Sequence, residues 1–560
     1  MLRYSPASQL TFADFDVPSL QKLDPRNRWV VLAEIMPWDQ LALVFAASPT
    51  APRLDGPGRP THDLRLVMGA LLVQHLEALS DERTLELIRE NVYVQFFCGL
   101  PGFQAEPPFE ASSLTHWRAW LGDAGAQALS ETLADILEER RRRSSGTMDG
   151  DAPGGDAPGG DAPGGDAPDG DAPDGDAPGK TKSPTAGEPG GELAEAPAPN
   201  RGTLLLDATC APADVRYPTD VSLLAEARRA LEGVLDALWR RCTLIGCGPT
   251  DKPRTYRRTA RKSFAAFSRR RRPSRKVVRR ERRRQLQWAE RDLGHCGALL
   301  DDLVAADAHQ GALTARQHRR LLVCAEVLRQ QRLMHESGAR RCDDRIVSVT
   351  QPHVRPIVRG KAGARAEFGP KVDVSLSEGI ARVECASFDA YHEGCIAIAA
   401  CERYHQRHGR FPEKVLVDAA YLSRENRRYF KARGIRYAAK PQGRPPKDAD
   451  KLAAYRAACA EADTPGERNP IEGWFGVAKR RYRLGRLRTR RAAVTLGEVY
   501  LIAMAVNLAS ELTRLAVALR CLIGTVRKWL GTEEAVLDVP PSRTYTRLQV
   551  CQLNTTLCKV

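Results

Sequence analysis

The stretch that decides the fold runs from residue 468 to residue 482 and reads RNPIEGWFGVAKRRY. We predict that it opens a helix, with Asn469 as the N-cap, Pro470 in the first helical position and Glu472 in the first turn. Glu472 and Lys479 are seven residues apart, so they share one face of that helix. A carboxylate and a cation on one face are typical of a site that holds a metal ion and a phosphate.

Two upstream segments are apolar runs that end in aspartate, namely LLLD at 204–207 and VLVD at 415–418. Three carboxylates on rigid elements can hold two Mg²⁺ ions about 3.5–4 Å apart, which is the arrangement that cleaves phosphodiesters. We therefore predict that Asp207, Asp418 and Glu472 come together. Each also has a purely structural interpretation, because an aspartate at a strand end is often a turn residue and Glu472 completes a capping-box pattern.

The charge of the chain is strongly basic and concentrated in one stretch. The 560 residues carry a net charge of +16, and residues 254–284 contain sixteen Lys or Arg against one acid. Such a density favours contact with a nucleic-acid backbone, although a merely solvated basic helix or an RNA-binding one has the same pattern. The cations that we predict to contact DNA are Arg257, Arg258, Arg261, Lys262, Arg269, Arg270, Arg271 and Arg272 in this stretch, together with Arg468 and Lys479.

Cysteine usage and hydropathy point to a cytoplasmic protein. The 14 cysteines are scattered and form no CxxC pair, so we expect free thiols and no zinc cluster. The N-terminal residues lack the apolar core of a signal peptide. The most apolar run, 499–523, contains Asn507, Glu511, Arg514 and Arg520, and we interpret it as a buried helix or helix pair.

The first part of the chain, 1–145, has a helical pattern. Apolar residues recur at helical spacing from 62 to 100, with a break at 80–82, and a further helix capped by Ser112 or Ser113 continues towards Arg143. A compact helical domain of this kind is either a DNA reader or a packing and dimerisation domain. Residues 146–200 repeat the unit Asp-Ala-Pro with almost no apolar side chain, and we predict a disordered linker.

The remainder, 201–530, alternates strand and helix patterns and predicts an α/β domain, a mixed sheet flanked by helices, with a helical insertion at about 221–342. A tail of residues 531–560 gives no signal. The strands that we predict lie at 203–209, 345–349, 371–376, 380–384, 414–418 and 435–440. The helices that we predict lie at 223–239, 276–304, 313–335, 394–407, 424–433 and 496–530.

Several of these stretches, taken in order, resemble bacterial insertion-sequence transposases of the DDE type, in the insertion-sequence-five-like group. The resemblance covers most of the chain outside the linker and the tail. The stretches that carry it are LDAT at 206–209 with YPTD at 217–220, RGKA at 359–362 with EFGPKV at 367–372, DAAY at 418–421 with RENR at 424–427, and residues 468–479; the helical segment 62–121 also looks like the family's N-terminal domain. The resemblance implies a ribonuclease-H-like catalytic core.

The same resemblance implies the site and the reaction. The family's two catalytic aspartates map onto Asp207 and Asp418 and its glutamate onto Glu472, as ligands of two Mg²⁺ ions for which Mn²⁺ substitutes. The family's signature also has a tyrosine, and this chain has Pro465 there. The implied partner is double-stranded DNA: a homodimer pairs the terminal inverted repeats, metal-activated water frees a 3′-OH, and that hydroxyl attacks target DNA. The competing hypothesis is a catalytically inactive DNA-binding descendant of a transposase.

Overall fold

The computed structural model describes residues 23–47, 62–146, 199–339, 341–358, 366–438, 445–446, 448–462 and 466–529. Residues up to Leu508 form one compact unit, and a second unit begins at Ala509. The predicted linker lies outside the described residues except at its two ends, and the predicted tail and Pro465 lie wholly outside them. The disorder that we predict for the linker therefore stays a prediction.

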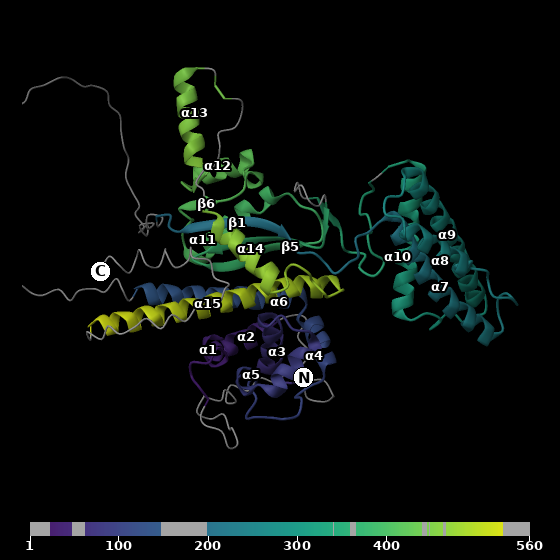
Figure 1. Ribbon diagram of the computed structural model, residues 1–560, viewed down its shortest axis with the longest axis horizontal. Helices are drawn as coiled ribbons and strands as arrows, with labels where there is room; N and C mark the ends of the chain where they lie inside the picture. Colours follow the sequence, from purple (N-terminus) through teal and green to yellow (C-terminus); the bar gives the residue numbers. More distant parts are fainter. Residues whose placement is uncertain are drawn as a thin grey trace, which may run out of the picture. The chain divides into compact units, whose positions relative to one another are not determined.

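A mixed sheet forms the centre of the first unit, with the strand order β5-β4-β1-β6-β7 (Figure 1). Strand β1 pairs antiparallel with β4 and parallel with β6; β4 pairs antiparallel with β5, and β6 parallel with β7. The predicted mixed sheet flanked by helices is thus confirmed, and its order is consistent with a ribonuclease-H-like core. The strands are β1 (Thr203–Cys210), β4 (Lys371–Ser377), β5 (Ile380–Ser387), β6 (Lys414–Leu416) and β7 (Arg436–Tyr437).

The two faces of β1 have different roles because side chains alternate along a strand. Leu204 and Leu206 are fully buried in a cluster with residues of α11 (Ala397–His408) and α12 (Arg424–Ala432). The alternate set, which includes Asp207, faces the side where α14 (Asn469–Arg481) packs against β1 and β4. The buried residues of α14 are Ile471, Trp474, Phe475 and Ala478. One face of the sheet is therefore a core, and the other carries the polar residues.

Four local predictions are wrong. The segment 345–349 pairs with no strand among the described residues; its apolar side chains Ile346, Val347 and Val349 are buried in hydrophobic clusters, which gives an apolar run like that of a strand. Helix α14 begins at Asn469, so Arg468 occupies the cap position and makes no side-chain cap. The helix expected to start after Ser112 or Ser113 is α6 (Ala111–Gly146), which starts earlier. Strand β7 is also shorter than the predicted 435–440.

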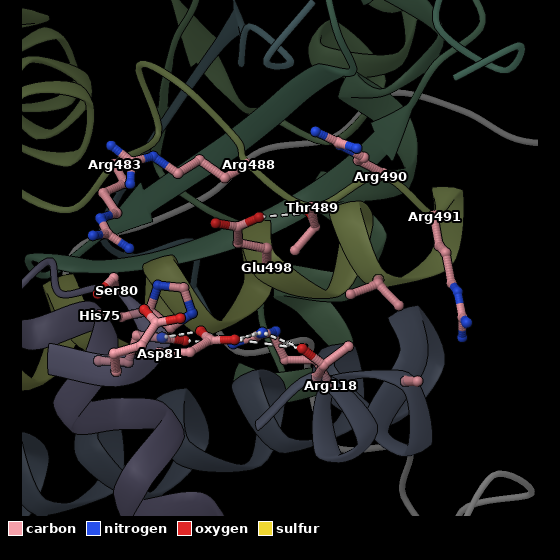
Figure 2. Close-up of a pocket in the computed structure, with 15 residues that line it drawn as sticks. His75, Ser80, Asp81, Arg118, Arg483, Arg488, Thr489, Arg490, Arg491 and Glu498 are labelled. Carbon is pink, nitrogen blue, oxygen red and sulfur yellow. Dashed lines mark hydrogen bonds and ion pairs between the residues drawn. The ribbon is translucent and has the colours of Figure 1, made fainter. Parts of the chain in front are cut away.

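The N-terminal part is helical, as predicted. Arg118 on α6 donates hydrogen bonds to both carboxylate oxygens of Asp81, at 3.0 and 2.6 Å, and to Gln74 at 2.7 Å (Figure 2). These bonds tie α6 to α3 and to the start of α4. The helices are α1 (Arg28–Ile35), α2 (Trp38–Ala46), α3 (Leu64–Leu76), α4 (Asp81–Glu90), α5 (Val92–Phe97) and α6.

Helix α6 bends at Gly122, whose φ of 59° lies in the left-handed region that glycine adopts without strain. At this bend α15 (Ala492–Trp529) comes very close, since a Cβ on Gly497 would lie 2.2 Å from the Gly122 carbonyl oxygen. Beyond the bend α6 reaches the sheet, where Arg382 of β5 donates to Glu138 at 2.6 Å. The N-terminal helices are thereby joined to the sheet.

Helix α15 runs from the first unit into the second. In the first unit, Asn507 makes hydrogen bonds of 3.0 and 2.8 Å with both backbone groups of Ala381, which covers the edge strand β5. In the second unit, Arg514 donates to Glu511 at 2.7 Å. By length and composition alone Ala492–Thr525 could cross a membrane, but 72% of its apolar window is buried within the protein, as in the core helix of a soluble protein.

Four helices lie between β1 and the next strand, where we predict the helical insertion. They are α7 (Asp220–Ile245), α8 (Arg257–Ser268), α9 (Arg275–Ala305) and α10 (Ala315–Glu336). Helices α7, α9 and α10 share an apolar core of leucine, valine, alanine and cysteine side chains. Helix α8 and helix α13 (Ala449–Ala462) were not predicted; the two short strands β2 (Pro356–Val358) and β3 (Ala366–Phe368) were also missed.

Candidate active site

Asp207 and Asp418 stand level with each other on neighbouring parallel strands. The register pairs Leu205 with Leu416, so two further residues along each strand bring the chain to the two aspartates. Asp207 lies within β1, and Asp418 follows β6 after one intervening residue, Val417. The parallel pairing therefore produces, from residues 211 positions apart, the juxtaposition that we predict from two apolar runs.

Arg468, the residue before α14, lies between these carboxylates. One of its terminal nitrogens is 3.5 Å from Oδ2 of Asp207, and the other is 3.8 Å from Oδ1 of Asp418. Both distances exceed those of a charge-assisted hydrogen bond, so the arginine neutralises the pair without locking it. The side chains remain partly accessible, with 20% of Asp207, 58% of Asp418 and 31% of Arg468 exposed.

The free oxygens of this pair fit a hard divalent cation. Oδ1 of Asp207 accepts a hydrogen bond from the Ala208 amide at 2.8 Å, and Oδ1 of Asp418 accepts one from the Ala419 amide at 2.7 Å. Each carboxylate thus has one oriented oxygen and a second oxygen that can bind a ligand. Across the described ranges, however, no group of three or more His, Cys, Asp or Glu side chains is close enough to hold a metal ion.

Glu472 lies one helical turn beyond Arg468, and its amide donates to the Arg468 carbonyl at 3.4 Å. Residues four apart share a face of a helix, so Glu472 is on the side of α14 from which Arg468 reaches the aspartates. Its side chain is exposed. Lys479, half-buried, is two turns further along α14. The structure brings the two aspartates together directly, and Glu472 belongs to the adjoining helix face.

The charge state of Asp207 depends on this environment. Burial raises the pKa of the Asp207 carboxyl above its ordinary value, and the nearby charges of Asp418 and Glu393 act in the same direction. The Ala208 amide and the guanidinium of Arg468 lower the pKa of Asp207 and oppose that shift. A divalent cation would oppose it as well, because a positive charge favours the ionised form.

Behind the pair lies a buried polar layer that sequence reasoning missed. Asp373 on β4 is fully buried, and it accepts hydrogen bonds from the hydroxyl groups of Tyr421 and of Tyr391, the latter at 2.5 Å. Burial raises the pKa of Asp373 to about 6. The signal was available in the sequence, since Asp373 interrupts the apolar strand KVDVSLS with a charge.

Tyr421 and Asn426 fix the loop that carries Asp418. Tyr421 is fully buried in the short 3₁₀ turn Ala419–Tyr421, which starts from Asp418 itself. The Asn426 side-chain amide donates to the carbonyls of Tyr421 at 2.6 Å and Gly394 at 2.7 Å. Both residues belong to the stretches 418–421 and 424–427 that carry the resemblance. Their roles are to position the carboxylate.

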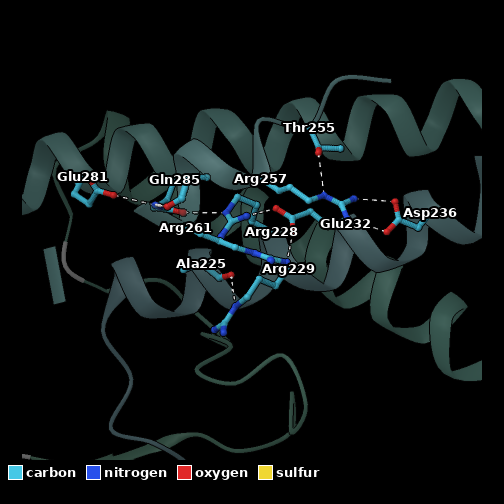
Figure 3. Close-up of polar contacts among 11 residues, drawn as sticks. Ala225, Arg228, Arg229, Glu232, Asp236, Thr255, Arg257, Arg261, Glu281 and Gln285 are labelled. Carbon is cyan, nitrogen blue, oxygen red and sulfur yellow. Dashed lines mark hydrogen bonds and ion pairs between the residues drawn. The ribbon is translucent and has the colours of Figure 1, made fainter. Parts of the chain in front are cut away.

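The basic stretch of the insertion divides into paired and exposed cations. Arg257 donates to both oxygens of Asp236, at 3.0 and 2.8 Å (Figure 3), and only 30% of its side chain is exposed. Arg261 lies 3.4 Å from the buried carboxylate of Glu232 but keeps 61% of its side chain exposed. Both anchor α8 to α7. The exposed cations of the set are Arg258, Lys262, Arg269, Arg270, Arg271 and Arg272.

Three comparisons with known proteins bear on this geometry. Residues 18–120 match a family described as a transposase domain (DUF772), and residues 415–509 match one described as a transposase DDE domain. The second match contains Asp418 and Glu472. The chain is also 38% identical over 109 residues to an uncharacterised protein, ORF8 in the nfe locus of Rhizobium meliloti, a match that covers 19% of this chain and 49% of that protein. The chain thus spans about half the length of the curated relative it matches, and no solved structure matches it.

Proposed function

Because the chain belongs to the DDE transposases of bacterial insertion sequences, we propose that Asp207, Asp418 and Glu472 form the site at which it cuts and transfers DNA strands. The observation that carries the proposal is the contact of one arginine, Arg468, with both aspartates at the edge of the DDE segment. If the two aspartates were only turn residues at strand ends, we would not expect them to lie side by side and to contact the same arginine. We also assign the sheet to the ribonuclease-H-like fold on its strand order.

The roles follow from the chemistry of each side chain. Asp207 and Asp418 would hold divalent metal ions through their free oxygens, with Glu472 contributing from α14. Such ions, when bound, supply Lewis-acid stabilisation of the phosphate and an activated water. Arg468 offers two parallel N–H donors, a geometry that matches a phosphate as well as a carboxylate. When divalent cations bind Asp207 and Asp418, the guanidinium of Arg468 would be released from the aspartates and could bind a scissile phosphate.

The substrate that we propose is double-stranded DNA carrying the element's terminal inverted repeats, bound by a homodimer in the cytoplasm. The exposed cations of α8 and of the turn after it supply a backbone-binding surface on the insertion. Arg257 is engaged by Asp236, so among the predicted DNA contacts we expect it to hold α8 in place. The other exposed arginines remain the proposed phosphate contacts.

The test is a nicking assay on a labelled duplex that carries the element's own end, with Mg²⁺ present. We expect a nick that leaves a 3′-OH, and we expect Asp207→Asn to abolish it while DNA affinity is retained. Because ionised Asp207 is needed and its pKa is raised, cleavage should increase as the pH rises through that pKa. Binding without any nick, even with Mn²⁺, would instead identify an inactive DNA-binding descendant.

A further inference from the structure

A cleft of about 420 Å³ separates the N-terminal helices from the segment that follows α14. One wall comes from α3, the start of α4 and α6, and the other from residues within 483–498. In Figure 2 the arginine segment runs above the cleft, and His75, Asp81 and Arg118 lie below it. Five arginines and three carboxylates line the cleft, so its charge is positive.

Four arginines of the upper wall have no carboxylate partner. Within the described residues, none of Arg483, Arg488, Arg490 and Arg491 forms an ion pair, and the last three are exposed. Their neighbour Arg486 is the contrast, because it donates to Asp214 at 2.7 Å. Burial and the adjacent charge of Arg488 lower the pKa of Arg483. Like charges held this close repel one another, and a bound anion would relieve that repulsion.

Two of the three carboxylates of the cleft are engaged in hydrogen bonds, and the third, Glu82, is exposed. Asp81 is engaged by Arg118 and by the Gln74 amide at 2.7 Å. Glu498 is 5% exposed and accepts a hydrogen bond from Thr489 at 2.7 Å. Asp81 is therefore engaged on the wall opposite the arginines and Glu498 on their own wall, where its charge acts on Arg483. The exposed side chains of Arg488, Arg490 and Arg491 remain available to a ligand from outside.

His75 adds a second, independent sign of a ligand. Only 2% of it is exposed, it lines the cleft, and neither ring nitrogen has a hydrogen-bond partner in the part of the chain that the structure describes. Burial, together with the charges of Arg118 and Arg483, lowers its pKa to about 3. The ring is therefore neutral near pH 7, with one nitrogen as a donor. A buried polar group without a partner costs about 1–3 kcal/mol, so an oxygen-rich occupant would be stabilised here.

The arginine wall is anchored to the segment that follows β1, the strand that carries Asp207. The Leu487 amide donates to the Pro212 carbonyl, and the Asp214 amide donates to the Leu487 carbonyl, each at 2.8 Å. Arg483 has a φ of 69°, a strained conformation for a non-glycine residue that points to a fixed turn. Along α14, the nine steps from Glu472 to Arg481 span about 14 Å, which is about four base-pair steps of DNA.

We propose that this cleft binds backbone phosphates of the DNA that continues from the cleavage site. Arginine donates two parallel hydrogen bonds to phosphate oxygens, and several arginines without carboxylate partners suit successive phosphates of one strand. The inference rests on the proposed function for the identity of the polyanion. It adds a second DNA-binding surface, formed by the N-terminal helices and the residues after α14, to the basic stretch of the insertion.

The test measures DNA affinity against salt concentration for Arg488→Ala/Arg490→Ala, made in the Asp207→Asn background without divalent metal. Each lost phosphate contact should lower the slope of log K against log[salt] by about 0.9, so we expect a decrease of about 2. At fixed low salt the affinity should fall at least about tenfold. The matched control is Arg83→Ala/Arg89→Ala, which removes the same charge from two exposed arginines of α4 that pair with their own neighbours.

An unchanged slope, or an equal loss in the control, would overturn the proposal. Arg488→Lys/Arg490→Lys should keep most of the slope, since it keeps the charge, and a loss there as large as with alanine would also contradict phosphate binding. The two proposals fail separately. If the parent protein cuts DNA but the double alanine variant leaves the salt slope unchanged, the cleft does not bind phosphate. If the double variant lowers the slope but the parent protein never cuts DNA, the catalytic function is contradicted.

Discussion

Two regions of the molecule place one arginine beside two acids, and they differ in burial. In the core, Arg468 contacts Asp207 and Asp418 at 3.5 and 3.8 Å, and all three side chains are partly exposed. In the insertion, Arg228 bonds to Glu232 and to Gln285 (Figure 3). Asp292 lies nearby, and the three charged side chains are at most 3% exposed.

The difference in burial distinguishes the insertion cluster, which stabilises the fold, from the core cluster, whose side chains can exchange partners. A buried ion pair has no water to replace either partner, so it must stay intact for the helices to pack. A half-exposed pair with long contacts can exchange its partners for a ligand at little cost. The insertion cluster therefore holds α7, α8 and α9 together, and the core cluster is the one that we propose to bind metal and phosphate.

The largest loss of stability is expected when the buried cluster around Arg228 is broken. Arg228→Met removes the buried cation and leaves Asp292 without compensation and Glu232 with only the exposed Arg261 beside it, which should lower the free energy of unfolding by about 3–5 kcal/mol. The matched change in the core, Arg468→Met, should cost less than about 1 kcal/mol. Urea denaturation of both variants measures the contrast. Equal losses at the two positions would remove the distinction between the clusters.

Measuring protein stability as a function of pH tests the same contrast between the buried and the half-exposed cluster. Burial, with the charge of Glu232, raises the pKa of Asp292 to about 7, and neither of its oxygens has a hydrogen-bond partner among the described residues. A raised pKa means that the folded state loses stability as the pH rises from the unfolded pKa through 7.

Asp292→Asn should remove that dependence. Between pH 4 and pH 8 its stability relative to the parent protein should increase by about 2–4 kcal/mol. The melting temperatures of the two proteins, compared across this range, provide the readout. A constant difference at every pH would show that Asp292 is ionised and compensated throughout.

A smaller effect is expected in the buried layer behind the aspartates. Tyr421→Phe removes one hydrogen bond to Asp373 and should cost about 1 kcal/mol. It should also slow cleavage several-fold, because the turn that starts at Asp418 loses an anchor. Tyr429→Phe is the control, since its hydroxyl donates to Glu402, a 39%-exposed acid outside the site. Equal cleavage rates in the two variants would deny Tyr421 a positioning role.

The smallest effect on stability is expected at the surface of the insertion. Arg261 is 61% exposed beside Glu232, and Arg261→Ala should change the free energy of unfolding by less than about 1 kcal/mol. The same variant should lower the salt slope of DNA binding by about 1 if its guanidinium contacts a phosphate. Calorimetry and a salt titration of binding provide both values, and an unchanged slope would assign Arg261 to folding alone.

Local patterns in the sequence predicted the strands that carry Asp207 and Asp418 because each is an apolar run closed by a charge. They could not show that β1 and β6 are neighbours, since strand order depends on tertiary packing. The same kind of pattern failed at 345–349, where apolar residues pack on helices without strand pairing. Strand propensity alone cannot distinguish a paired strand from an apolar segment that is buried without strand pairing.

The contacts made across long separations were not predictable. Asp373 was passed over because a single acid in a strand is usually an exposed residue, and its two tyrosine partners are 18 and 48 positions away. The cleft is assembled from residues near 74–119 and 483–498, and neither segment alone suggests a ligand. Charge density did predict the basic insertion, but not that Arg257 would be engaged by Asp236.

The most direct test of the central claim compares two aspartates that each contact an arginine in the structure. Asp418 contacts Arg468 at 3.8 Å, and Asp214 accepts hydrogen bonds from Arg486 at 2.9 and 2.7 Å. We would measure Mg²⁺-dependent nicking of the element's end by Asp418→Asn and Asp214→Asn at equal DNA occupancy. The account predicts a loss of at least about a thousandfold for Asp418→Asn and near-normal nicking for Asp214→Asn. Nicking by Asp418→Asn at the parent rate would contradict it.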